Sequence, residues 1–150
     1  MEKLPMTQDG AVQFTRMVRK IRLFSDMQMA LLEKILAWVC LYRCEKGEKI
    51  CRQGELGDSF FVVSTGSVSV SVKKGLFFST QVAVLRSGDC FGEMSLLGRA
   101  PRNATVTCEE ESRVFVLLSE NFNDILKSNP AFAEEIKKLA RQREFEDGKL

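Results

Sequence analysis

The sequence predicts a mainly β protein of the α+β class: an eight-stranded antiparallel β-roll (jelly roll) with helices before and after it. Three observations lead to this fold. Between about residues 39 and 118 the chain consists of short segments rich in Val, Phe and Ile, separated by glycines. Ser67–Val72 alternates strictly between Ser and Val, the period of a strand with one buried face. On both sides of this region, apolar residues recur at helical spacing instead.

Two helices are predicted ahead of the roll. Apolar residues recur at helical spacing from Ala11 to Ile21, which predicts a helix over 11–22 with its basic residues on the solvated face. Ser25 is followed three residues later by Gln28, which matches a capping box and predicts that a second helix begins there.

The strands of the roll differ in how they are covered. The serines of Ser67–Val72 are expected to face outward and the valines inward. Phe60–Val63 is a continuous apolar run, as expected of a strand buried on both faces. Further predicted strands are Gln81–Leu85, Asn103–Cys108 and Arg113–Leu118.

Helical periodicity returns after the roll. Ser119 is expected to cap a helix over Glu120–Lys127, and the pair Asn129-Pro130 then ends it and starts a last helix that runs from Ala131 to about Glu144.

The predicted organisation is a single domain with short extensions. An N-terminal helical segment covers residues 1–23, and the domain covers 24–145, with its roll at about 39–118 and its C-terminal helices at 119–145. Residues 146–150 form a tail. The sequence shows no internal repeat or long linker that would indicate a second domain.

Composition excludes many functions. The 150 residues contain no histidine, which excludes Ser-His-Asp and Cys-His catalysis and Cys/His zinc sites. The five cysteines are odd in number and form no C-x-x-C pair, which is typical of buried thiols in a reducing cytosol. The net charge of +2 does not indicate binding to nucleic acid or to a membrane. With neither a signal peptide nor an apolar run of spanning length, we expect a cytoplasmic protein or the cytosolic part of a membrane protein.

The candidate site lies in Phe91–Val106, where a short apolar turn separates two predicted strands. Gly92 allows close approach of the backbone, and the N–H groups at the start of a helical turn attract anions. Arg102 adds a planar cation suited to phosphate, and Glu93 an acceptor suited to a sugar hydroxyl. Taken singly, these features are also typical of an ordinary turn and a surface ion pair, so the residues alone leave both interpretations open.

The same stretch closely resembles the phosphate-binding cassette of cyclic nucleotide-binding domains, which read Phe-Gly-Glu, apolar residues, a spacer and Pro-Arg-x-Ala-Thr/Ser. Ile50–Gly66 resembles the first signature of that family, in which a glycine and an acidic residue precede four apolar residues and a closing glycine. The resemblance covers about residues 24–145 and is strongest to the regulatory domains of bacterial cyclic nucleotide-gated channels and of kinase regulatory subunits.

The resemblance implies a role for each residue of the site. Backbone amides of Gly92, Met94 and neighbours, Ser95 among them, would hold the cyclic phosphate together with Arg102. Glu93 would accept a hydrogen bond from the ribose 2′-hydroxyl. Ala104 and Thr105 would lie beside the phosphate. The residues that would line the sugar and base are Val63, Val84, Leu85, Cys90 and Phe91.

Two further implications concern selectivity and closure. Asn103 stands where the family's kinase subunits tend to carry Ala and its channels Thr or Ser, so the choice between cAMP and cGMP stays open, with cAMP favoured. In the family a C-terminal helix covers the base as a lid. Here Ile136 and Leu139 would supply its apolar face and Arg143 would stack on the purine. A helix packed as plain scaffold, with its basic face in solvent, is the alternative.

The function implied is a sensor in which binding of cAMP or cGMP moves the flanking helices and thereby controls an effector domain or protein. No further cofactor and no metal is expected, nor direct contact with nucleic acid or membrane. Two alternatives are the ligand-binding half of a Crp-like transcription regulator without its DNA-binding domain, and a scaffold that binds no nucleotide. An enzyme is not expected, because no nucleophile–base pair or metal cluster is visible.

Overall fold

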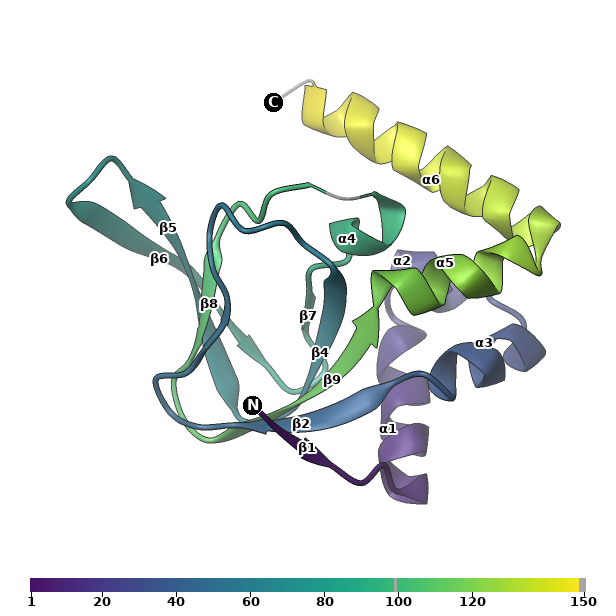
Figure 1. Ribbon diagram of the computed structural model, residues 1–150, viewed down its shortest axis with the longest axis horizontal. Coiled ribbons are helices and arrows are strands. Elements are labelled where there is room, and N and C mark those ends of the chain that lie inside the picture. Colours follow the sequence, from purple (N-terminus) through teal and green to yellow (C-terminus); the bar gives the residue numbers. More distant parts are fainter. Residues whose placement is uncertain (99, 149–150) are drawn as a thin grey trace.

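The computed structural model describes residues 1–98 and 100–148, with the side chains of these residues except 139, 140 and 142–148 (Figure 1). The helices before the roll are α1 (Gln8–Val18), α2 (Arg22–Ser25) and α3 (Met29–Leu36), and those after it are α5 (Ser119–Lys127) and α6 (Pro130–Gly148). The short helix α4 (Met94–Leu97) lies within the roll. The strands are β1 (Glu2–Leu4), β2 (Cys40–Cys44), β3 (Lys49–Cys51), β4 (Ser59–Thr65), β5 (Ser67–Lys74), β6 (Phe78–Arg86), β7 (Cys90–Phe91), β8 (Thr105–Cys108) and β9 (Ser112–Leu118).

The strands form two antiparallel sheets, which confirms the predicted roll with helices on either side. One sheet has the order β1-β2-β9-β4-β7 and the other the order β3-β8-β5-β6. The helices gather on the side of the first sheet, and the β5–β6 hairpin projects from the opposite side of the molecule (Figure 1).

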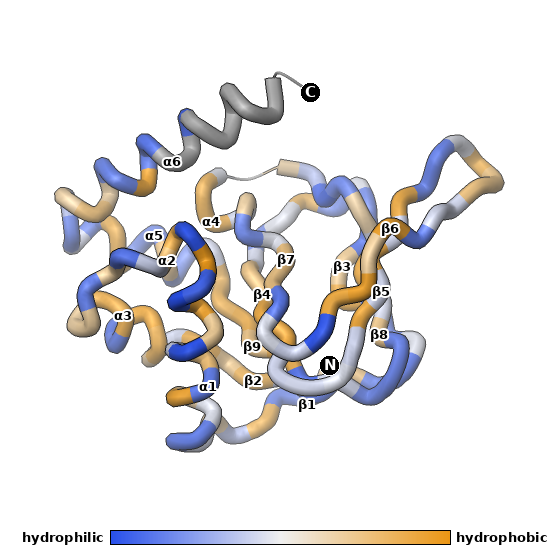
Figure 2. The backbone as a smooth tube through the Cα atoms, turned by 180° about the vertical axis from the view of Figure 1, so that it is seen from behind, coloured by the Kyte–Doolittle hydropathy of each residue, from blue (hydrophilic) through white to orange (hydrophobic). Residues whose placement is uncertain are grey.

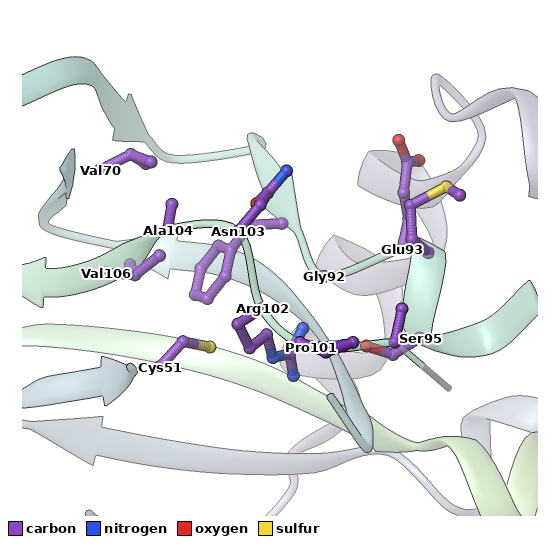
Figure 3. Close-up of a pocket in the computed structure, with 13 residues that line it drawn as sticks. Cys51, Val70, Gly92, Glu93, Ser95, Pro101, Arg102, Asn103, Ala104 and Val106 are labelled. Carbon is purple, nitrogen blue, oxygen red and sulfur yellow. The ribbon is translucent and has the colours of Figure 1, made fainter. Parts of the chain in front are cut away.

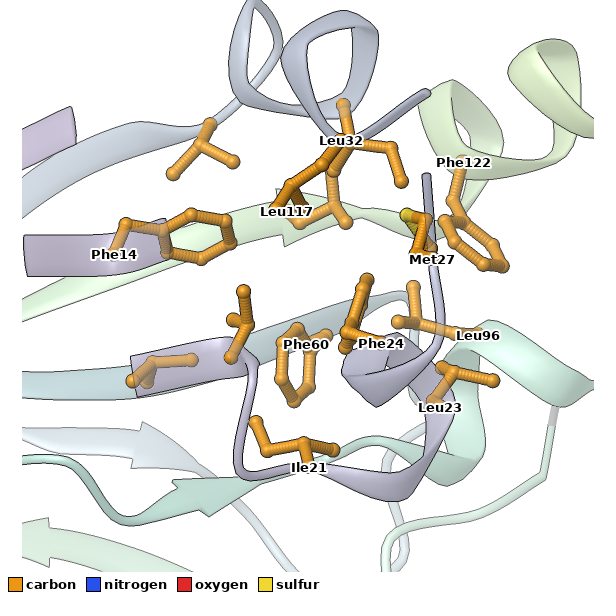
Figure 4. Packing of buried hydrophobic residues seen from close by; sticks show 14 of the residues in the cluster. Phe14, Ile21, Leu23, Phe24, Met27, Leu32, Phe60, Leu96, Leu117 and Phe122 are labelled. Carbon is orange, nitrogen blue, oxygen red and sulfur yellow. The ribbon is translucent and has the colours of Figure 1, made fainter. Parts of the chain in front are cut away.

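Strand β4 is buried on both faces, as its continuous apolar run predicts. Phe60 and Val62 belong to a core between the first sheet and the helices, together with Phe24 and Phe122 (Figure 4). Phe61 and Val63 belong to a second core, between the two sheets. One strand therefore couples the helices to the interior of the roll.

The N-terminal segment is part of this structure. Phe14 and Val18 of α1 are fully buried in the same core as Phe60. Strand β1 was not predicted, because three residues without alternation carry no local signal. Glu2–Leu4 becomes a strand by pairing with β2, which lies far along the chain.

Helix starts differ from the sequence expectation. Helix α1 begins at Gln8, where the Gly10 N–H donates to the Thr7 hydroxyl at 3.0 Å, and it ends at Val18 rather than at residue 22. The capping box at Ser25 is wrong: Ser25 ends α2, which is held by the buried Leu23 and Phe24, and its hydroxyl donates to the Arg22 carbonyl. The cap at Ser119 is wrong as well, since this buried residue is the first of α5 and Leu118 precedes it as the N-cap.

Strand β5 follows the predicted alternation only in part. Val68 is fully buried, but Ser67 is buried too, and its backbone N–H donates to the Ser112 hydroxyl at 3.2 Å. Strand β8 pairs with β5 from Val68 to Ser71, so the rest of β5 pairs with β6 alone.

The five cysteines are all free thiols, of which Cys44, Cys51 and Cys108 are buried. Cys40 and Cys90 remain partly exposed, contrary to the expectation of buried thiols throughout. A hydrogen bond with Cys108 and burial raise the pKa of Cys44, which keeps this thiol uncharged. In the part of the chain that is described, none of the helices has the length and apolar character needed to cross a membrane.

Candidate functional site

A cavity of about 370 Å³ opens between α4 and the second sheet. This volume is typical of small-molecule sites, which span about 300–1,000 Å³. Its lining comes from β3, β5, β7 and β8, from α4 itself and from the loops at either end of α4 (Figure 3). The lining residues are Cys51, Val70, Phe91, Gly92, Glu93, Met94, Ser95, Ala100, Pro101, Arg102, Asn103, Ala104 and Val106.

The guanidinium of Arg102 is held in place at the cavity from two sides. Its Nη2 donates to the Ser59 carbonyl at 2.8 Å, and its Cζ lies 5.6 Å from the centre of the Phe61 ring. The Arg102 backbone is fixed as well: its N–H donates to the Glu55 carbonyl at 2.7 Å, and its carbonyl accepts from the Gly54 N–H at 2.8 Å. The arginine therefore presents a preorganised cation, because little side-chain freedom is left to lose on binding.

Two glycines make room for this guanidinium. Gly92 has φ +77°, and a Cβ at this position would lie 2.5 Å from Arg102 Nη1 and 2.7 Å from the Ser59 carbonyl oxygen. A Cβ on Gly57 would lie 2.5 Å from Ser95 Oγ and 3.1 Å from Arg102 Cζ. Gly92 is thus required both by its backbone conformation and by the close approach of the arginine. The sequence had indicated close approach of a ligand to Gly92 but not this packing.

Helix α4 places backbone N–H groups beside Arg102. The first residues of a helical turn have no acceptors within the helix, and their N–H groups carry partial positive charge. Leu96 anchors the turn in the core with the helices, where it is 2% exposed, and the neighbouring Ser95 is buried at the cavity. Glu93 is half-buried at the start of this turn, on the side of the cavity away from Val70 and Val106 (Figure 3).

The opposite wall of the cavity is apolar and was not predicted. Cys51, Val70 and Val106 line it from β3, β5 and β8. Burial raises the pKa of Cys51 to about 11, so this thiol is uncharged at neutral pH and acts as a small apolar group. The alternation in Ser67–Val72 contained the signal for Val70, which shares a face with the inward Val68, but the pairing of three strands was needed to identify the wall.

The structure brings together eight of the residues predicted for the site. Those that line the cavity are Phe91, Gly92, Glu93, Met94, Ser95, Arg102, Asn103 and Ala104. Asn103 is exposed at the rim. Thr105 does not line the cavity, and its hydroxyl accepts from the Gln53 N–H at 3.0 Å.

Four residues expected around the sugar and base do not line the cavity, for reasons of strand geometry. Cys90 and Phe91 are neighbours on β7 and face opposite ways, so Cys90 packs towards the helices while Phe91 stacks on Phe61 with ring centres 4.7 Å apart. Val63 is fully buried between the sheets. Val84 and Leu85 are half-buried on β6, opposite Ser69 and Val68 of β5, and Leu85 packs against the core between the sheets.

The residues expected to form a lid lie elsewhere or are not described. Ile136 is 5% exposed and packs in the core with the helices, and Phe132 packs against the same core. The side chains of Leu139 and Arg143 lie outside the described residues. Of the α6 side chains that the structure describes, none lines the cavity.

The geometry defines what the cavity can hold. A fixed arginine and helix-start amides suit one compact anion, Glu93 suits a hydroxyl group, and the valine wall suits an apolar or aromatic face. Among the described residues no cluster of His, Cys, Asp and Glu could hold a metal ion.

Comparison with known proteins agrees with this chemistry. The model of the cyclic nucleotide-binding domain family matches residues 42–129. A cyclic nucleotide-gated potassium channel of Rhizobium etli is 32% identical over 128 residues, which cover 85% of this chain and 34% of the channel. A cAMP-dependent protein kinase regulatory subunit of Blastocladiella emersonii is 33% identical over 135 residues, 85% of this chain and 32% of the subunit.

The fold comparison leads to the same family. A solved structure of cAMP-bound PfPKA-R superposes with a TM-score of 0.75 at 26% identity, covering 82% of this chain and 44% of that one. The chain thus spans about a third of the length of the curated relatives that it matches. Domains of this family are regulatory rather than catalytic. The family model, the curated relatives and the fold agree, and the chain belongs to the cyclic nucleotide-binding domain family.

Proposed function

We propose that the cavity binds a 3′,5′-cyclic nucleotide and that the domain uses this binding to control an effector in the same chain or in a partner protein. The observation that carries the proposal is the fixed position of the Arg102 guanidinium. It is held between Gly57 and Gly92, beside the first turn of α4. The cation and the N–H groups of the turn converge on a space large enough for a single anionic group.

The cyclic phosphate is assigned to Arg102 and to the amides of Gly92 and Met94. The Ser95 N–H already donates to the Gly92 carbonyl at 3.0 Å, and Ser95 lines the same cavity. The guanidinium has five N–H donors, and the bond to the Ser59 carbonyl uses one of them. The guanidinium can therefore make a bidentate bond to phosphate oxygens while it keeps its bond to the Ser59 carbonyl. Ala104 lies beside this space on the cavity wall, where a larger side chain would fill it.

The ribose and base are assigned to the remaining walls. Glu93 accepts a hydrogen bond from the 2′-hydroxyl, the one ribose hydroxyl that a 3′,5′-cyclic phosphate leaves free. The base lies against Val70 and Val106, with Asn103 at the exposed rim. We assign cAMP as the preferred ligand and cGMP as the competitor, with selectivity residing at that rim.

Helix α4 is the element that transmits binding to the helices. It borders the cavity with Met94 and Ser95, and its Leu96 belongs to the same helical core as Leu23 and Phe122 (Figure 4). A ligand that draws the α4 amides towards its phosphate also shifts Leu96 within that core. The switch requires that the two helix arrangements differ in ligand affinity.

Calorimetric titration with cAMP, cGMP and 5′-AMP tests the proposal. We expect saturable binding of cAMP, weaker binding of cGMP and much weaker binding of 5′-AMP, whose open phosphate carries an extra charge and lacks the ring geometry. Both cyclic nucleotides should be recovered unhydrolysed after incubation with the protein. Absence of heat and of protection against thermal unfolding for every ligand would contradict the proposal.

A further inference from the structure

The end of the β5–β6 hairpin is the most exposed apolar surface that the structure describes. Leu76, Phe77 and Phe78 are consecutive at the turn and are 80%, 89% and 74% exposed. Three adjacent large apolar side chains in water are costly, and such clusters mark a surface that meets a partner. We call residues 73–78 the hairpin tip.

The hairpin tip projects because nothing pairs with it beyond its own two strands. Strand β8 leaves β5 after Ser71, so Lys73 and Lys74 pair only with Ser79 and Phe78 of β6. The base of the projecting part is held by Gln53: the Lys73 N–H donates to its Oε1 at 2.7 Å, and its Nε2 donates to the Lys73 carbonyl at 3.3 Å. The tip is thus the end of an arm that is anchored at its base.

The charge around the hairpin tip is entirely positive in the sequence. Lys73 and Lys74 directly precede the turn, and both are exposed. Between Asp58 and Asp89 the chain contains no acidic residue. Arg86, the third basic residue of this stretch, pairs with Ser67 at the far end of the hairpin and is not part of the tip. Figure 2 shows hydrophilic and hydrophobic residues next to each other at this end of the molecule.

We propose that the hairpin tip inserts into the interface of an anionic lipid bilayer. Leu76 and Phe77, together with Phe78, would enter the boundary between headgroups and acyl chains, while Lys73 and Lys74 would stay at the level of the negative headgroups. A bilayer needs no complementary shape, and a projecting tip can enter it without displacing any other part of the fold. Val70 of the cavity wall, which lies on β5 where that strand pairs with β8, stays outside the lipid.

A protein partner fits the hairpin tip less well. Each aromatic side chain can bury roughly 150–250 Å², and with one Leu the tip offers less than the about 800 Å² that each partner contributes to a standard protein interface. The positive charge at the tip also opposes a second copy of the same tip, because the like charges would face each other.

The test measures binding of the 150-residue chain to phosphatidylcholine vesicles with and without phosphatidylserine, by co-sedimentation in the absence of nucleotide. We expect binding to the anionic vesicles that weakens as salt screens the lysines. Replacing Leu76, Phe77 and Phe78 together by Ser should weaken partitioning about a hundredfold. Lys73→Glu with Lys74→Glu should weaken it at least about tenfold, on the anionic vesicles only.

Matched controls separate the tip from general surface effects. Val12→Ser with Met29→Ser removes exposed apolar side chains from the helical side of the molecule, and Lys137→Glu with Lys138→Glu makes the same charge change on α6. Both controls should leave vesicle binding unchanged. All variants should keep the circular dichroism and the nucleotide response of the parent chain, because the tip does not line the cavity.

Fluorescence reports insertion directly, because Trp38 is the only tryptophan of the chain and lies away from the tip. In a Trp38→Phe background, Phe77→Trp should shift its emission to the blue on anionic vesicles, while Trp38 of the parent should not. Failure of the parent to bind vesicles, or binding that the tip variants leave unchanged, would overturn the proposal. So would a parent dimer that the serine variant converts to a monomer without any vesicle binding, since a second copy would then cover the tip.

Discussion

Arg102→Ala tests the assignment of the phosphate most directly. The substitution removes the cation and leaves the ligand charge with backbone amides alone. Hydrogen bonds to charged groups contribute about 1.5–3 kcal/mol each. Arg102 is half-buried, so water screens part of its charge, and we place the loss for two such bonds at about 2–4 kcal/mol rather than at their full sum. At about 1.4 kcal/mol per factor of ten, affinity for cAMP should fall roughly 30- to 1,000-fold.

The same substitution should also cost some stability, because Arg102 is part of the fold without ligand. It removes the bond to the Ser59 carbonyl at 2.8 Å and the contact with the Phe61 ring at 5.6 Å. Together these contribute about 1–2 kcal/mol to the free energy of unfolding. The variant should remain folded, since a domain of this size has a larger reserve.

Calorimetry and chemical denaturation separate the two effects. Arg102→Lys keeps the charge but loses the planar fork, and it should recover part of the affinity without the full alanine loss. Arg52→Ala is the matched control, because this exposed arginine of the neighbouring loop makes only a surface ion pair with Glu55 at 3.8 Å. If Arg102→Ala bound cAMP within about twofold of the parent, the assignment of the phosphate to this residue would be refuted.

The other predictions concern the same cavity. Glu93→Gln should weaken cAMP binding by about 1 kcal/mol. The parent should bind 2′-deoxy-cAMP poorly, and the variant should bind it only slightly more weakly than the parent does. If the two losses of binding free energy were additive, Glu93 and the 2′-hydroxyl would not be in contact. Gly92→Ala should lower stability by about 1–2 kcal/mol and abolish high-affinity binding by displacing Arg102. Gly98→Ala is the control, because an added Cβ there meets nothing within 4 Å. It should change neither the stability nor the affinity for cAMP, as measured by the same denaturation and titration. Because burial raises the pKa of Cys51 from 9.0 to about 11, the protonated thiol favours the folded state, and this contribution should be complete below pH 9 and lost between pH 9 and 11. Denaturation across that range should show a smaller loss for Cys51→Ser, and equal slopes for the two proteins would contradict the shift.

Local sequence patterns determined the elements whose burial follows from their own periodicity. The continuous apolar run Phe60–Val63 has its two faces in two different cores, and this burial is readable in four residues. The cassette Phe91–Val106 was equally readable, because its glycine, its apolar turn and its arginine serve a local backbone shape. Most of the residues that line the cavity lie in this one segment.

Tertiary structure alone decided what depends on pairing between distant segments. β1 exists only through β2, and Ser25 and Ser119 fail as caps because burial of their neighbours sets where the helices begin. The hydrogen bond that fixes the Arg102 guanidinium joins it to Ser59, 43 positions away in the chain. Leu76–Phe78 at the hairpin tip are as apolar as a buried strand, and they lie in solvent because β8 pairs with β5 only as far as Ser71. The periodicity of a sequence indicates which face of a helix or strand is apolar. The register between elements decides whether another element covers that face.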